Sequence, residues 1–221
     1  MDERTLYCGN NIQKRLDIIL EQITTKQRLL IHSCCAPCSS YVLEYLVPYF
    51  DIWVYYYNPN ITEREEYEKR IAELKRLIDC MNRDHQWDIH LIEGPYEPEC
   101  FLKTARGLEQ CKEGGERCRR CFELRLAKSA EYAGNHSFDY YTTTLTISPL
   151  KNAGMLNEIG DEMGRKYKIP FLPSDFKKRN GYKRSIELSK EYNLYRQDYC
   201  GCIYSKRDRH HEAAPEELYL K

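Results

Sequence analysis

Three cysteines stand close together near the start of the chain, where their thiols could bind a metal. Cys34, Cys35 and Cys38 follow a short apolar run, Arg28–Ser33, that predicts a buried β-strand. The residues after them predict a helix that ends at Pro48. In a doubly wound α/β fold such a strand–loop–helix junction lies at the carboxyl edge of the sheet, where ligands bind. Nucleotide-binding loops place glycines there to hold phosphate, so three thiols indicate a metal instead.

A second pair, Cys118 and Cys121, forms a Cys-x-x-Cys pattern at the start of a predicted helix. Residues three apart share one helix face, so both sulfurs can bind one metal or cluster. We expect the helix N-terminus and the arginines beside the pair to lower the pKa of both thiols. Together with the first loop, the pair supplies four or five thiolates. That number suits a structural zinc site, but adjacent cysteines are uncommon in such sites and favour an iron–sulfur cluster.

Cys200 and Cys202 form a third group, in the sequence Tyr-Cys-Gly-Cys. A disulfide between two cysteines separated by one residue closes a small, strained ring and is easily reduced. The pair is therefore either a redox-active disulfide or a ligand pair for a second metal. The remaining cysteines carry no spacing signal: Cys8, Cys80, Cys100 and Cys111.

Other polar residues are weaker candidates. His32 precedes the cysteine loop, and we interpret it as a hydrogen-bonded core histidine rather than a ligand. Hydroxyls at the end of the fourth predicted strand, in Thr142–Thr144 and Ser148, suit a ribose or phosphate. A later loop combines basic residues with Tyr182, a pattern typical of RNA contact. Its basic residues are Lys177, Lys178, Arg179, Lys183 and Arg184.

Composition limits the class of protein. The 221 residues include eleven cysteines and carry no net charge, with 34 basic and 34 acidic side chains. Residues 1–110 hold 13 Lys and Arg against 18 Asp and Glu, so a polyanion should meet the more basic half after them. The sequence lacks an apolar stretch of membrane-spanning length, and its first ten residues do not resemble a signal peptide. We therefore expect a cytoplasmic protein without membrane contact, in which structural disulfides are rare.

The elements that position these residues alternate between strand and helix. Strands are predicted at Arg28–Ser33, Asp51–Tyr57, Trp87–Ile92 and Phe138–Leu145, with a short extended piece from Ile169. This alternation predicts an α/β fold: a Rossmann-like parallel sheet of about four to five strands with helices on both faces. We expect one catalytic domain over residues 1–221, with a mostly helical C-terminal extension from about residue 170.

Five segments together resemble a known family. HSCCAPCSSYVLEYL, CRRCFELRL, YYTTTLTISPLKN, DFKKRNGYKRS and LYRQDYCGC occur between Leu29 and Ser205 in the order found in QueH, the cobalamin-independent epoxyqueuosine reductases. The resemblance implies a fold like that of the nucleotide α-hydrolases, a [4Fe-4S] cluster, and the last step of queuosine synthesis in the tRNA anticodon. The first loop lacks the Ser-Gly-Gly pattern of ATP-using relatives of this fold, which argues against adenylation.

The implied reaction sets the expected roles. Conversion of an epoxide to an alkene needs two electrons and two protons and releases water. We expect an unidentified electron donor and a second redox group besides the cluster, either the Cys200/Cys202 dithiol or a second, mononuclear iron. Asp175 is the expected supporting carboxylate or proton donor, with Asp139 behind it. The predicted cluster ligands are Cys34, Cys35, Cys118 and Cys121.

Two other classes of function fit the same residues. One is a zinc-stabilised RNA-binding module without catalysis. The other is a cluster-dependent tRNA thiolation enzyme on a similar fold. Metal analysis separates the first alternative from a reductase, and a requirement for ATP separates the second.

Overall fold

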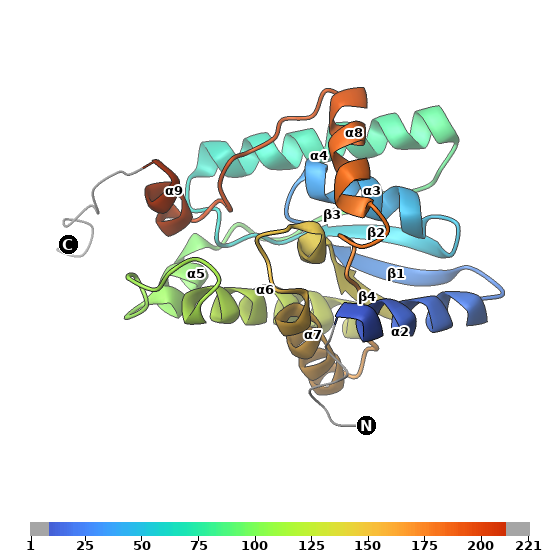
Figure 1. The fold of residues 1–221 in the computed structure, drawn as a ribbon, viewed down its shortest axis with the longest axis horizontal. Coiled ribbons are helices and arrows are strands. Elements are labelled where there is room, and N and C mark those ends of the chain that lie inside the picture. Colours follow the sequence, from blue (N-terminus) through green and yellow to red (C-terminus); the bar gives the residue numbers. More distant parts are fainter. Residues whose placement is uncertain (1–8, 211–221) are drawn as a thin grey trace.

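A four-stranded parallel β-sheet forms the centre of the molecule in the computed structural model, which describes residues 9–210 (Figure 1). Its strand order is β3-β2-β1-β4, and each neighbouring pair is parallel. The α/β class and the parallel sheet predicted from the sequence are therefore confirmed. The strands are β1 (Gln27–His32), β2 (Phe50–Tyr56), β3 (His90–Glu93) and β4 (Tyr140–Thr143).

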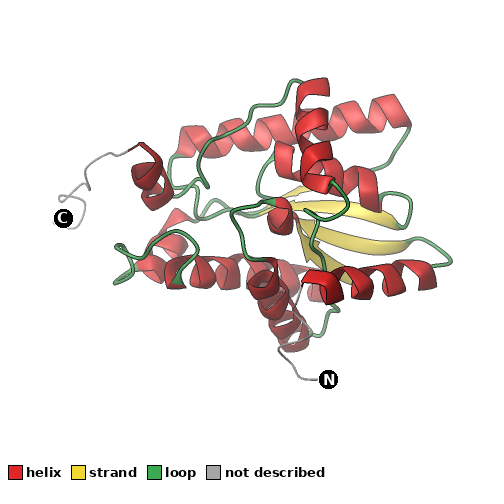
Figure 2. Ribbon diagram, viewed as in Figure 1, coloured by secondary structure: helices red, strands yellow, loops and turns green. Residues whose placement is uncertain are grey.

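Helices cover both faces of this sheet (Figure 2). Successive side chains of a strand point to opposite faces. Leu29 and Ile31 of β1 accordingly pack with the helices on one face, and Leu30 packs with α6 and α7 on the other. The helices are α2 (Gly9–Gln22), α3 (Ala36–Leu46), α4 (Arg64–His85), α5 (Pro98–Ala105), α6 (Glu116–Asn135), α7 (Ala153–Tyr167), α8 (Gly181–Glu191) and α9 (Ile203–His210), with a 3₁₀ turn η1 (Thr144–Ile147).

The fourth strand differs most from the sequence prediction. The sequence predicts a strand as far as Leu145, but β4 ends at Thr143 and the chain turns into η1. Thr143 caps this turn, because its side chain accepts a hydrogen bond from the Leu145 N–H. The expected extended piece pairs with β4 only at Tyr141, which forms a parallel bridge with Phe171.

The described part of the chain after about residue 170 contains α8 and α9, joined by a segment without regular secondary structure. Helix α8 packs against α3, the helix that follows the first cysteine loop. The segment between α8 and α9 carries Cys200 and runs beside the loops at the carboxyl ends of β1 and β2. Among the described residues, helices long and apolar enough to span a membrane are absent.

Parallel strands bring their carboxyl ends to one edge of the sheet. The loops after β1, β2 and β4 therefore meet there. Ser33, just after β1, donates its backbone N–H to Tyr55 of β2, and the Asn58 side chain donates to the Ser33 carbonyl. From the loop after β4, Thr144 Oγ1 lies 3.3 Å from the Cys34 amide nitrogen. This edge fixes the position of the first cysteine group.

Candidate metal centre

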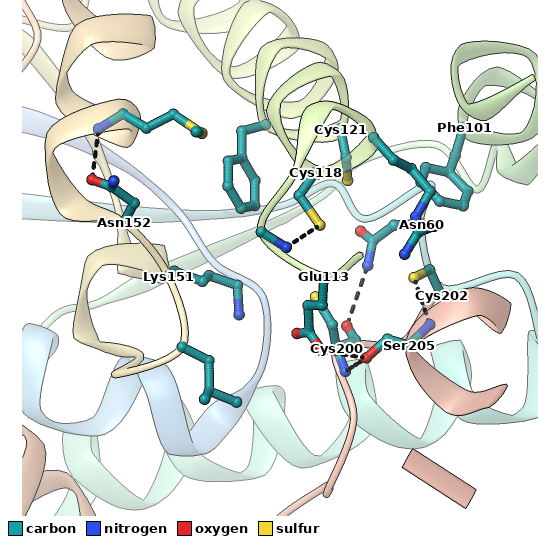
Figure 3. A pocket seen from close by; sticks show the side chains of 15 residues that line it. Asn60, Phe101, Glu113, Cys118, Cys121, Lys151, Asn152, Cys200, Cys202 and Ser205 are labelled. Carbon is teal, nitrogen blue, oxygen red and sulfur yellow. Dashed lines mark hydrogen bonds between the residues drawn. The ribbon is translucent and has the colours of Figure 1, made fainter. Parts of the chain in front are cut away.

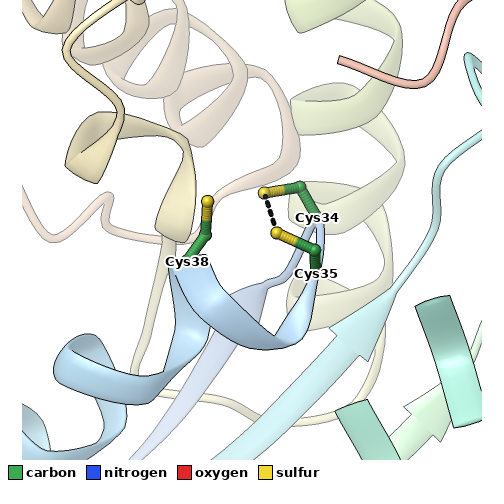
Figure 4. A group of neighbouring side chains, drawn as sticks. All are labelled: Cys34, Cys35 and Cys38. Carbon is green, nitrogen blue, oxygen red and sulfur yellow. Dashed lines mark hydrogen bonds between the residues drawn. The ribbon is translucent and has the colours of Figure 1, made fainter. Parts of the chain in front are cut away.

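The first cysteine group forms a tight cluster of sulfurs at the start of α3 (Figure 4). The Sγ atoms of Cys34, Cys35 and Cys38 all lie within 4.8 Å of one another. Cys35 has extended backbone and precedes the first helical residue, and Pro37 occupies the first turn of α3, where its missing N–H costs no helical hydrogen bond. This local geometry turns all three thiols toward one point. Cys38, to which the sequence assigns no definite role, belongs to this cluster.

The three thiols differ in pKa. Hydrogen bonds from Cys35 and Cys38 lower the pKa of Cys34 well below its usual value, against the effect of burial. The hydrogen bond to Cys34 raises the pKa of Cys35 to about 12, with burial adding to the shift. The pKa of Cys38 is raised for the same reasons. Cys34 is therefore the thiol of the three that gives up its proton most readily, and a metal cation that binds all three sulfurs would displace the remaining protons.

Four other cysteines, those of the Cys-x-x-Cys and Cys-Gly-Cys patterns, line a small cavity (Figure 3). Cys118 and Cys121 reach it from the first turns of α6, and Cys200 and Cys202 from the segment that leads into α9. The backbone N–H of Gly114 lies 3.2 Å from Cys118 Sγ. Like every cysteine among the described residues, these four are free thiols. Cys8 lies outside those residues.

The prediction of a lowered pKa for the Cys-x-x-Cys pair was wrong. Burial raises the pKa of Cys118, and it raises the pKa of Cys121 to about 12. Two of the arginines beside the pair, Arg119 and Arg120, form ion pairs with acidic residues of their own helix, at 3.2 and 3.0 Å. The third, Arg117, is buried and donates to loop carbonyls. Desolvation therefore outweighs the helix N-terminus at this pair.

The two cavities adjoin each other. Their volumes are about 30 Å³ for the one beside Cys118 and about 160 Å³ for the one beside Cys34. Both are lined by Glu113, Leu150, Lys151 and Cys200. The structure therefore places the predicted ligands in two neighbouring groups, with Cys200 common to both cavities. The larger of these two cavities is also lined by Ser148, Tyr182 and several arginines.

A buried arginine lies between the two cysteine groups. Arg125 on α6 donates to Asn58 Oδ1 at 2.5 Å, and its Nε lies 3.3 Å from His32 Nε2. Its remaining nitrogen, Nη1, has no hydrogen-bond partner among the described residues. Burial acts to lower the pKa of Arg125, but the nearby Cys121, Cys200 and Cys34 raise it. The thiols of both groups are neighbours of this buried cation, which would stabilise them once they lose their protons.

His32 is a hydrogen-bonded core residue. Its Nδ1 lies 2.9 Å from Thr143 Oγ1, and its Nε2 lies 3.1 Å from the Tyr57 carbonyl oxygen. Burial, followed by the charge of Arg125, lowers its pKa to about 3, so the ring is neutral at physiological pH. The interpretation of His32 as a core histidine agrees with these contacts.

The segment that carries Cys200 and Cys202 is held by side chains from α4 and from the loop after β2. Arg70 Nη1 and the Asn60 amide both donate to the Cys200 carbonyl, at 3.3 and 3.2 Å. Arg70 is itself buried and pairs with Glu66. Gly201 has a φ of +110°, a conformation that side-chain-bearing residues rarely adopt. The spacing Cys-Gly-Cys therefore reflects a sharp turn as well as a pair of thiols.

The predicted aspartates lie elsewhere. Asp175 is buried and forms an ion pair of 2.8 Å with Lys177, and neither cavity beside the cysteines is lined by it. Asp139 precedes β4 at the amino edge of the sheet, where it accepts a hydrogen bond from the Arg28 amide. Asp139 is thus at the opposite edge from the cysteines. The role expected of Asp175 stays a prediction.

Much of the predicted basic loop is already paired with acidic residues. Arg179 contacts Asp17 at 2.6 Å, and Arg184 contacts Glu44 at 2.6 Å. The expected hydroxyls are also engaged within the protein, since the Thr142 side chain donates to the Leu172 carbonyl. Two cationic residues of the centre, Arg125 and Lys151, were not singled out from the sequence. Both belong to segments that resemble the known family, and this resemblance was the sequence signal that could have identified them as site residues.

Fold and site together define an α/β protein with a Rossmann-like parallel sheet and a thiol-rich centre, able to bind metal, at the carboxyl edge. The family model described as epoxyqueuosine reductase QueH matches residues 29–208. The chain therefore belongs to the epoxyqueuosine reductase QueH family. This confirms the family predicted from the five segments, and with it the predictions of an oxidoreductase and of epoxyqueuosine reductase activity.

Individual relatives agree. The chain is 41% identical to an epoxyqueuosine reductase QueH of Streptococcus pyogenes serotype M1, over 90% of this chain and 78% of the relative. It is 42% identical to that of Staphylococcus aureus, over 89% of this chain and 82% of the relative. A shorter relative from Thermotoga maritima is 34% identical, over 87% of this chain and 98% of its own length. The similarity thus spans most of each relative as well as most of this chain.

Proposed function

We propose that this protein reduces the epoxide of epoxyqueuosine in tRNA to the alkene of queuosine. Both carbon–oxygen bonds of the epoxide break, two electrons and two protons are taken up, and the oxygen leaves as water. The observation that carries the proposal is the convergence of two cysteine groups on adjoining cavities in a chain of the QueH family.

The donor set fits an iron–sulfur centre. Thiolates are the ligands that such clusters use, and the two groups offer more than the four a [4Fe-4S] cluster requires. We propose that the cluster is held by Cys34, Cys35, Cys118 and Cys121, the pairs nearest the end of β1 and the start of α6. The close approach of the Cys38 sulfur makes it an additional candidate ligand. When bound, the cluster supplies electrons one at a time.

The second redox group is proposed to be the Cys200/Cys202 pair. Cys200 lines both cavities, and Cys202 lines the smaller one. In the dithiol role the pair gives up two electrons and releases two protons to solvent as it closes to a disulfide. The alternative is that the two sulfurs bind a second, mononuclear iron.

The larger cavity is the proposed entrance for the modified nucleotide. It is lined by Arg196, Arg209 and Tyr182, and by Cys34 and Cys38 of the first cysteine group. Basic and aromatic side chains suit the phosphate and base of an RNA loop. A tRNA substrate places the reaction in the cytoplasm, and a separate electron donor is required.

The reaction is tested by anaerobic incubation of the reduced protein with tRNA that carries epoxyqueuosine, followed by mass analysis of the nucleosides. We expect a nucleoside that has lost one oxygen atom, without any requirement for ATP. Protein that contains zinc without visible absorbance, and leaves the nucleoside unchanged, would instead support an RNA-binding module. Sulfur gained in an ATP-dependent reaction would support thiolation.

A further inference from the structure

Lys151 is the cation that borders both cavities of the centre. It follows the 3₁₀ turn after β4, and in Figure 3 its amino group points from the α7 side toward the space between Cys118 and Cys200. Within residues 9–210, hydrogen bonds or ion pairs to its Nζ are absent. The side chain is only half-buried, so its amine is open to whatever enters the cavity.

Cysteine sulfurs and the Glu113 carboxylate share the two cavities with this amine. Burial acts to lower the pKa of Lys151, but Cys200, Cys34 and Cys38 outweigh that effect and raise it. The Lys151 side chain is an ammonium at neutral pH, as an ordinary lysine is. A partly desolvated ammonium that lacks a hydrogen-bond acceptor is costly, and a substrate oxygen would satisfy it.

The established reaction brings an oxygen of that kind to the centre. The epoxide oxygen is a hydrogen-bond acceptor that must leave as water, and it gains negative charge as the first carbon–oxygen bond breaks. Cys34 and Cys38 line the same cavity as Lys151, so an epoxide within reach of their sulfurs is also within the volume that the amine borders. An ammonium beside developing negative charge stabilises it.

We propose that Lys151 is a catalytic residue that binds the epoxide oxygen through its ammonium group and gives it a proton as the first carbon–oxygen bond breaks. This inference rests on the proposed function. The electron pair comes from the reductant that the reductase reaction uses. Lys151 supplies one of the two protons, and solvent that reaches the open cavity supplies the other and restores the ammonium.

A different role would be that of a counter-ion which only neutralises a thiolate-rich centre. The variant Lys151→Arg separates the two roles, because a guanidinium keeps the positive charge but does not give up a proton near neutral pH. Lys151→Met removes both charge and proton at similar side-chain length. Lys103→Met, at an exposed lysine on α5, is the matched control.

The experiment measures anaerobic single-turnover rates on tRNA that carries epoxyqueuosine, together with iron and sulfide content and visible absorbance. We expect Lys151→Met and Lys151→Arg to retain the metal centre and to react at least about 100-fold more slowly than wild type. The control should match wild type. A near-normal rate in Lys151→Arg would overturn the proposal, as would loss of iron in parallel with loss of rate.

A second readout does not depend on turnover. Brief acylation of the amines in wild-type protein, followed by peptide mass analysis, reports the accessibility of Lys151. We expect substrate tRNA to protect Lys151 more strongly than the same tRNA with unmodified guanosine does. Equal protection by both tRNAs would contradict contact with the epoxide. Wild-type protein that leaves the epoxide unreduced would instead count against the proposed function.

Discussion

The thiols of the centre differ in how readily they lose a proton, and their surroundings explain the difference. The pKa of Cys34 is lowered because two neighbouring thiols donate hydrogen bonds to it. Cys121 is buried and keeps its proton, with a pKa raised to about 12. Buried Cys202 likewise has a raised pKa. Metal binding must therefore release protons from several sulfurs.

The variant Cys202→Ser tests whether the Cys200/Cys202 pair acts as a dithiol or binds a second iron. We expect the iron content to be unchanged and turnover to be abolished, because a serine hydroxyl cannot form the disulfide. If the pair binds a second iron instead, the variant should lose one iron per chain, since a thiolate binds soft metals better than a hydroxyl does. Iron content and activity are measured on the same sample. Full iron with full activity would remove the pair from the mechanism.

The cysteines of the centre lie at the ends of strands and helices, which fix their positions. The carboxyl end of β1 and the first turn of α3 hold one group, and the first turns of α6 hold Cys118 and Cys121. The segment before α9 depends on a turn at Gly201, clamped by Arg70. A Cβ at this glycine would lie 2.8 Å from Ile61 Cγ1 and 3.1 Å from Arg70 Nη1. That turn therefore fixes the carbonyls and sulfurs on either side of it.

Gly201→Ala should weaken this turn. We expect a decrease of about 1–3 kcal/mol in the free energy of unfolding, from the unfavourable φ and the close approach of neighbouring atoms together. Gly107→Ala is the control, because Gly107 also has a positive φ, +77°, but open space around its Cβ position. Denaturant unfolding measures both variants. Equal decreases in the two would show that the packing around Gly201 contributes nothing.

The sequence predicted local features of the centre better than contacts between distant segments. The apolar run before Cys34 and the helix after it were confirmed, because strand and helix periodicity are local properties. The pKa direction at Cys121 was wrong, because the sequence shows the helix N-terminus but not the burial that outweighs it. Arg125 and Lys151 were missed as parts of the centre, because only the folded sheet edge brings them to the cysteines.

The larger of the two cavities of the centre lies beside a basic region formed by α8 and the loop before it. Many of those charges are already paired, so fewer are available to a polyanion than the sequence suggests. Lys178 and Lys183 are exposed, and ion pairs involving either are absent from the described part of the chain. They are therefore the side chains of the loop best able to meet tRNA phosphates.

Binding of tRNA should weaken steeply with salt, because basic side chains that bind phosphates release counterions. We expect the double variant Lys178→Ala/Lys183→Ala to flatten the plot of log affinity against log salt, by about 0.7–0.9 for each phosphate that the variant leaves unneutralised. The variant Lys26→Ala/Lys166→Ala removes two exposed lysines elsewhere and should keep the wild-type slope. An unchanged slope in the first variant would place the RNA surface elsewhere.

The central claim is that sulfurs from both cysteine groups hold one metal centre that reduces the epoxide. The most direct measurement is iron, sulfide and product formation in Cys34→Ala and Cys118→Ala, one from each group, beside the control Cys80→Ala on α4. The account predicts that both site variants lose the visible absorbance of the cluster together with turnover, while the control keeps both. A Cys34→Ala or Cys118→Ala protein with full iron, full sulfide and wild-type conversion of epoxyqueuosine in tRNA would contradict it.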